Sequence, residues 1–101
     1  MSELVKVASK KEIPAGGSRI VKAKETELAL FNVGGAFHAM ENACLHRGAP
    51  LAEGCLEGAV VTCPWHGWQF DVTTGALLMN PAEKIRTFKT HIKGDDIYVE
   101  V

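Results

Sequence analysis

A chain of 101 residues, of which 47% are hydrophobic and 23% charged, is long enough to form one domain around a single apolar core. Its formal net charge of −1 at pH 7 offers no basic surface of the kind that binds nucleic acid, so we expect no nucleic-acid partner. No apolar run approaches the roughly 20 residues that cross a bilayer, and the acidic start has no apolar signal region, so we expect no membrane association and a cytoplasmic location.

Short apolar stretches separated by turn residues run through the whole chain. Residues 4, 5 and 7 are apolar and begin a first strand, and at most one helical turn is expected, near residues 10–13. Residues 28–31 are apolar at every position, which is typical of a central strand with two buried faces, and Gly34-Gly35 predicts a tight hairpin turn. In chain order, the predicted strands cover residues 4–7, 20–23, 28–33, 36–40, 60–62, 76–79, 88–92 and 97–101.

This pattern predicts an all-β fold. Many short strands at regular spacing, without a long amphipathic helix, are typical of an antiparallel sandwich or a barrel. We expect residues 1–101 to form a single domain.

Two short segments each combine a thiolate donor with an imidazole donor. Cys44-Leu45-His46 is followed, after sixteen intervening residues, by Cys63-Pro64-Trp65-His66, so that the two read C-x-H-x16-C-x-x-H. Two thiolates and two imidazoles form a complete ligand set for a metal centre.

The composition of each segment distinguishes two kinds of metal site. A structural zinc site also uses two Cys and two His, but it usually pairs like with like, as C-x2–4-C followed by H-x3–5-H. Here each half mixes the two types, which favours a [2Fe–2S] cluster in which two His replace two Cys on one iron. The remaining His38 and His91 lie outside both segments, and we expect neither to be a ligand. A structural zinc module without a redox role remains the alternative.

These residues resemble the Rieske family over nearly the whole chain. Residues 44–51 resemble the first Rieske box, residues 63–71 the second, Asn80-Pro81-Ala82 the proline loop that covers the cluster, and residues 94–99 the closing hairpin. The resemblance implies a Rieske-type antiparallel β-sandwich with two cluster-binding loops at one end, which turn at Gly48 and Gly67. It also implies one [2Fe–2S] cluster, whose ligands are Cys44 and Cys63 on the inner iron and His46 and His66 on the outer iron.

Four positions depart from the quinol-oxidising branch of this family. The two cysteines that form a disulfide between the boxes in that branch are here Ala49 and Trp65. Its Ser and Tyr, whose hydroxyls donate to sulfur, are here Trp68 and Phe70. Hydrogen bonds to sulfur stabilise the reduced state, so their loss lowers the potential. The chain therefore resembles the low-potential ferredoxins that serve oxygenases.

The resemblance implies a soluble one-electron carrier and not a catalytic subunit. Its expected partners are a flavin-dependent ferredoxin reductase, which supplies the electron, and a terminal oxygenase, which receives it. Both contacts would be small and transient. The residues expected to surround the exposed histidine edge and touch these partners are Leu45, Arg47, Pro50, Trp65 and Pro81.

Two enzyme roles are alternatives to the carrier role, and the sequence is compatible with only one of them. The small Rieske subunit of an assimilatory nitrite reductase, or of a similar complex, remains an alternative. A stand-alone oxygenase needs a further iron site with two His and a carboxylate, whereas only His38 and His91 are spare and 101 residues leave no space for a catalytic domain.

Overall fold

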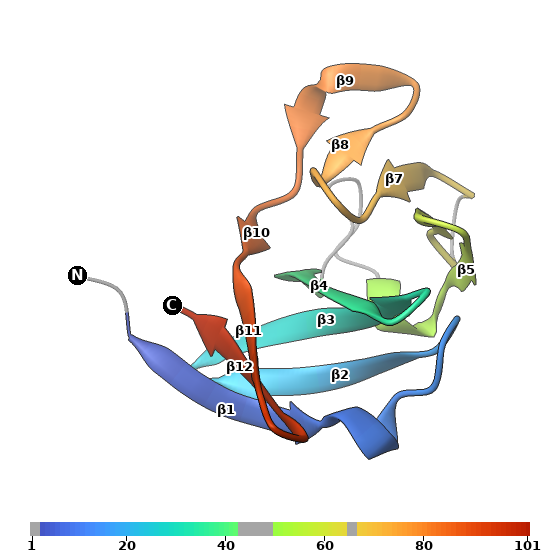
Figure 1. Ribbon diagram of the computed structural model, residues 1–101. Helices are drawn as coiled ribbons and strands as arrows, with labels where there is room; N and C mark the ends of the chain where they lie inside the picture. Colours follow the sequence, from blue (N-terminus) through green and yellow to red (C-terminus); the bar gives the residue numbers. More distant parts are fainter. Residues whose placement is uncertain (1–2, 43–49, 65–66) are drawn as a thin grey trace.

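The computed structural model describes residues 3–42, 50–64 and 67–101, and its strands form three antiparallel sheets (Figure 1). No α-helix occurs in these ranges, and so no helix there is long and apolar enough to cross a membrane. The first sheet has the order β1-β12-β11, with β1 at Leu4–Ser9, β12 at Asp96–Glu100 and β11 at Thr90–Lys93. The second has the order β10-β4-β3-β2, with β10 at Thr87–Phe88, β4 at Ala36–Glu41, β3 at Thr26–Val33 and β2 at Ser18–Ala23.

The third sheet is built from five short strands and lies beyond β4 (Figure 1). Its order is β5-β6-β7-β8-β9, with β5 at Cys55–Glu57, β6 at Val60–Thr62, β7 at Gln69–Asp71, β8 at Ala76–Leu77 and β9 at Asn80–Lys84. Two 3-10 turns complete the elements, η1 at Lys10–Glu12 and η2 at Leu51–Glu53.

The second sheet is the middle layer, and it contributes apolar side chains to two cores. Leu28 and Leu30 of β3 belong to one buried cluster, together with Ile97 and Val99 of the first sheet. Ala29 and Phe31, the alternate residues of β3, belong to the other, which includes Val61, Phe70 and Leu77 of the third sheet. Successive side chains of a strand point to opposite faces, so a strand buried on both faces must be apolar throughout. The prediction of an all-β fold with a central strand near residues 28–33 is confirmed.

The structure corrects three details of the predicted strands. The stretch 76–79 pairs only over Ala76–Leu77, because Leu78 and Met79 form the turn into β9. The stretch 88–92 divides between β10 and β11, which pair with β4 and β12 respectively. The pattern missed β5, β7 and β9, because β5 and β7 are short and surround one inward apolar side chain with exposed or polar residues, while β9 is exposed at every position.

Candidate metal centre

Of the four expected ligands, Cys63 alone lies within the described residues, and Cys44, His46 and His66 lie outside them. The expected partner-contact residues Leu45, Arg47 and Trp65 also lie outside the described residues. Cys63 directly follows β6 and is 2% exposed. Its side chain belongs to the same apolar cluster as Val61 and Phe70, and it forms no disulfide. A cysteine that binds a metal does so as a thiolate, and the metal supplies the positive charge that such a buried anion requires.

The segment from Cys63 to Trp68, which contains the expected ligand His66, is closed by two backbone hydrogen bonds. The N–H of Cys63 donates to the carbonyl oxygen of Trp68 at 2.7 Å, and the N–H of Gly67 donates to the carbonyl oxygen of Cys63 at 3.1 Å. Gly67 has a φ of +71°, a conformation that residues with a Cβ adopt at a cost. The turn expected at Gly67 is therefore confirmed, and it reverses the chain between β6 and β7.

The ends of residues 43–49, which contain Cys44 and His46, are joined by a side chain. Asn42 ends the preceding described stretch and is buried, and its Oδ1 accepts a hydrogen bond from the N–H of Ala52 at 2.8 Å. Ala52 belongs to η2, which begins directly after Pro50. The chain positions on either side of the first box are thus fixed relative to each other.

Gly54 allows a close approach between the segment that follows the first box and the residue that precedes Cys63. It ends η2, and its N–H donates to the carbonyl oxygen of Leu51 at 3.0 Å. A Cβ on Gly54 would overlap the carbonyl oxygen of Thr62, the residue immediately before Cys63. The next residue, Cys55, then pairs with Thr62 across β5 and β6. The absence of a side chain at Gly54 allows the exit of the first segment to lie against the entry of the second.

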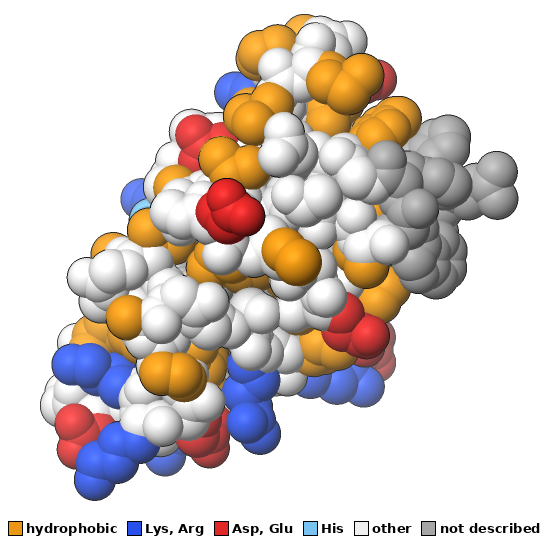
Figure 2. Space-filling view, turned by 90° about the vertical axis from the view of Figure 1, so that its right-hand side faces the viewer, with side chains coloured by type: hydrophobic (Ala, Val, Ile, Leu, Met, Phe, Trp, Pro, Cys, Tyr) orange, Lys and Arg blue, Asp and Glu red, His pale blue; other side chains and the backbone are white. Residues whose placement is uncertain are grey.

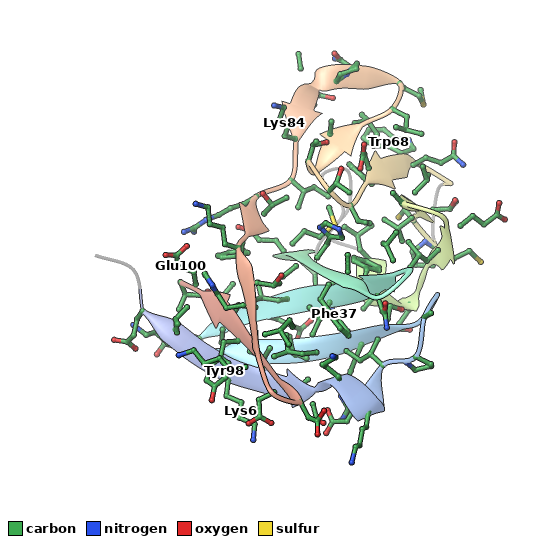
Figure 3. All side chains as sticks on the ribbon, in the orientation of Figure 1. Lys6, Phe37, Trp68, Lys84, Tyr98 and Glu100 are labelled. Atoms are coloured by element: carbon green, nitrogen blue, oxygen red, sulfur yellow. The ribbon has the colours of Figure 1, made fainter. Side chains whose placement is uncertain are left out.

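The aromatic residues expected near the cluster occupy the same apolar core as Cys63. Phe70 is fully buried in it, and Trp68 is half-buried against it, just before β7 (Figure 3). Neither side chain carries a hydroxyl. These two residues therefore add apolar surface to the core that contains Cys63, and neither can donate an O–H hydrogen bond to sulfur.

The remaining predicted residues fall in different places. Pro50 is half-buried before η2, and Pro81 is exposed on β9, so the expected proline loop is an edge strand over Asn80–Lys84. Proline fits an edge strand, where its missing N–H breaks no ladder. Beside it, Leu78 and Met79 are exposed, and Figure 2 shows hydrophobic side chains gathered at that upper end of the molecule.

The two histidines expected not to bind metal lie on strands. His38, on β4, lines a cavity of about 370 Å³ with Val72 and Phe88. His91, on β11, has its Nε2 at 4.0 Å from a carboxylate oxygen of Glu100. Within the described part of the chain, no three His, Cys, Asp or Glu side chains come together as a metal site.

Two residues that sequence reasoning did not single out support this region. Neither Asn42 nor Gly54 is a metal-ligand residue type, and neither belongs to the two boxes. The adjacency of Asn42 to the first box is the one signal that points to it.

Comparison with known proteins gives a consistent result. The family model described as the Rieske [2Fe–2S] domain matches residues 3–89. The ferredoxin component of the naphthalene 1,2-dioxygenase system of Pseudomonas aeruginosa is 37% identical over 91 residues, which cover 89% of this chain and 88% of that protein. The ferredoxin subunit of 3-phenylpropionate/cinnamic acid dioxygenase from Escherichia coli K12 is 42% identical over 76 residues, which cover 73% and 72% of the two chains.

The solved structures agree with these relatives. A chain in the complex of reduced oxygenase and oxidized ferredoxin in carbazole 1,9a-dioxygenase superimposes with a TM-score of 0.86 at 35% identity. The superposition covers 95% of this chain and 91% of that one.

Proposed function

This chain belongs to the Rieske [2Fe–2S] domain family, and from that premise we propose that Cys44, His46, Cys63 and His66 hold its one [2Fe–2S] cluster. The donor set fits this group, because two thiolates and two imidazoles are the mixed ligands of such a centre. The burial of Cys63 and the close approach at Gly54 support the proposal, since a cluster bridging both boxes requires that the two segments lie together.

The chain is an electron carrier of an oxygenase system and not a catalytic subunit. The observation that carries this conclusion is the match to ferredoxin components over 88% and 72% of their lengths. When bound, the cluster accepts and releases one electron. Cys44 and Cys63 would hold the inner iron, and His46 and His66 the outer iron, so that an imidazole edge provides the short path to a partner.

The carrier requires one partner that receives its electron and one that supplies it. A terminal oxygenase receives the electron, in keeping with the solved complex of an oxygenase and a ferredoxin. We propose a flavin-dependent reductase as the donor. The contact with either partner would involve Leu45, Arg47, Pro50, Trp65 and Pro81, of which Pro81 is exposed on an edge strand.

The alternative function, a small subunit of a nitrite reductase, predicts a stable complex. Co-purification with a large subunit from native extract therefore separates the two roles.

The purified protein is expected to contain two irons and two acid-labile sulfides per chain, the content of one [2Fe–2S] cluster, and no zinc. Elemental and sulfide analysis of protein made with adequate iron checks this content, and a reductive titration should consume one electron per chain. Stoichiometric zinc without iron would identify a structural module and exclude electron transfer.

The midpoint potential is expected near the lower end of the Rieske range, which runs from about −150 to +300 mV. The reason is that Ala49 and Trp65 exclude the disulfide between the boxes, while Trp68 and Phe70 offer no hydroxyl to sulfur. Direct voltammetry at pH 7 measures it. A value near about +300 mV would instead indicate a quinol-oxidising protein.

A further inference from the structure

Asn42 stands at the junction of the middle sheet and the first Rieske box. It directly follows β4 and precedes Cys44 by two residues. Its side chain is 6% exposed, and only Asn32 is also polar and buried among the residues that the structure describes. Burial of an amide costs free energy unless its donors and acceptor are paired, so the partners of Asn42 indicate what its burial achieves.

Both ends of the Asn42 amide are paired with other segments. Its Nδ2 donates to Oε1 of Glu27 at 2.8 Å, while its Oδ1 accepts from the backbone N–H of Ala52 at 2.8 Å. The backbone N–H of Asn42 also donates to the carbonyl oxygen of Glu27 at 3.1 Å. Ser18 Oγ donates to the carbonyl oxygen of Ala52 at 2.7 Å, which connects the far side of the box to β2. These bonds tie both ends of residues 43–49 to the β2–β3 hairpin.

We propose that Asn42 is a positioning residue for the cluster: its amide joins the two ends of the first Rieske box and holds them to Glu27, so that Cys44 and His46 meet the second box. This inference rests on the ligand set proposed above. It predicts that loss of the amide accelerates cluster loss beyond what the accompanying loss of fold stability explains.

Asn32 provides a matched control within the same molecule. It too is 6% exposed, its Nδ2 donates to the carbonyl oxygen of Ile13 at 2.8 Å, and its Oδ1 accepts from the N–H of Gly35 at 2.7 Å. Each asparagine thus accepts from one backbone N–H and donates one side-chain hydrogen bond at the same exposure, although Asn32 donates to a backbone carbonyl where Asn42 donates to a carboxylate. Asn32 secures the β3–β4 turn and precedes no proposed ligand. Asn42→Ala removes the partner of the buried N–H of Ala52, and Asn32→Ala removes a partner of the buried carbonyl oxygen of Ile13, so losses of thermal stability of similar size are expected.

The first experiment compares cluster loss in the two variants. Reconstituted Asn42→Ala is expected to lose its visible absorbance in the presence of an iron chelator at least about tenfold faster than wild type. The rate for Asn32→Ala should stay within about threefold of the wild-type rate, since only the hydrogen bonds of Asn42 lie beside the first box. The midpoint potential should shift in Asn42→Ala alone. Equal rates and equal potentials in the two variants would show that Asn42 has only a general structural role.

The second experiment reverses the hydrogen bond between residues 42 and 27, and it serves even if the alanine variants fold poorly. In Asn42→Asp a carboxylate faces the Glu27 carboxylate, so rapid cluster loss is expected at pH 8. In the double variant Glu27→Gln/Asn42→Asp an amide again donates to a carboxylate, while Asp still accepts from Ala52, so the rate should return to within about threefold of wild type. Failure of the double variant to recover would overturn the proposal.

The controls separate this inference from the ligand assignment. A wild-type protein that takes up no iron–sulfur cluster would contradict the proposed function itself. A normal wild-type cluster whose loss is unaffected by the charge reversal at residues 42 and 27 would contradict only the role of Asn42.

Discussion

Cys63→Ser is expected to abolish cluster incorporation and to leave a chain without a cooperative unfolding transition. The thiolate is a proposed ligand of the inner iron, and ligand binding in such sites contributes directly to the free energy of folding. The substitution also places a hydroxyl in the apolar core around Val61 and Phe70, which costs about 1–3 kcal/mol if it finds no partner. Iron content, the visible spectrum and a thermal melt followed by circular dichroism measure the effect.

Cys55→Ser is the matched control for this result. Cys55 is exposed on the edge strand β5, so its replacement should leave iron content and thermal stability unchanged. A full complement of iron and an unaltered Rieske spectrum in Cys63→Ser would show that Cys63 is not a ligand.

Gly54→Ala is expected to be the most damaging substitution that touches no ligand. A Cβ at this position would overlap the Thr62 carbonyl oxygen, and neither group is the end of a flexible side chain, so the backbone of η2 or β6 must move. We expect a loss of about 3–4 kcal/mol in the free energy of unfolding, at the upper end of single substitutions. For a domain of this size, that loss lowers the melting temperature by roughly 15 °C or more. Separation of the two boxes should also reduce the iron content.

Gly58→Ala separates the overlap from the general cost of replacing a glycine. Gly58 lies in the β5–β6 turn of the same sheet with a φ of +59°, and a Cβ there would meet no atom within 4 Å. Only the left-handed conformation is penalised, at about 1–2 kcal/mol. Thermal melts and iron analysis of both variants test the difference. If Gly54→Ala melts within a few degrees of Gly58→Ala with full iron content, the close approach at Thr62 does not bring the two boxes together.

Local patterns in the sequence account for the fold class and the candidate ligands. Period-two alternation at 97–101, and the fully apolar run at 28–31, report burial on one face or both, because strand geometry ties side-chain direction to residue parity. The boxes at residues 44–46 and 63–66 are equally local, since few side chains bind iron and their mixed order is distinctive.

Features that depend on distant contacts could not be predicted in this way. The strands β5, β7 and β9 are short or exposed, and they exist because neighbouring strands pair with them. Met79 and Leu78 continued an apolar run in the sequence, yet they form an exposed turn because β9 must reverse to pair with β8.

The sequence by itself therefore determined the family and the all-β architecture of this protein, and it supplied the four proposed metal ligands and the missing hydroxyls beside them. Tertiary structure alone decided how the residues that flank the two boxes are held together. The role proposed for Asn42 depends on Glu27, fifteen residues earlier, and on Ala52, ten residues later, while the need for glycine at 54 arises from the carbonyl oxygen of Thr62. The physical reason is that residue type and spacing encode ligand chemistry and strand periodicity, whereas hydrogen bonds and close approaches between segments exist only after the chain has folded.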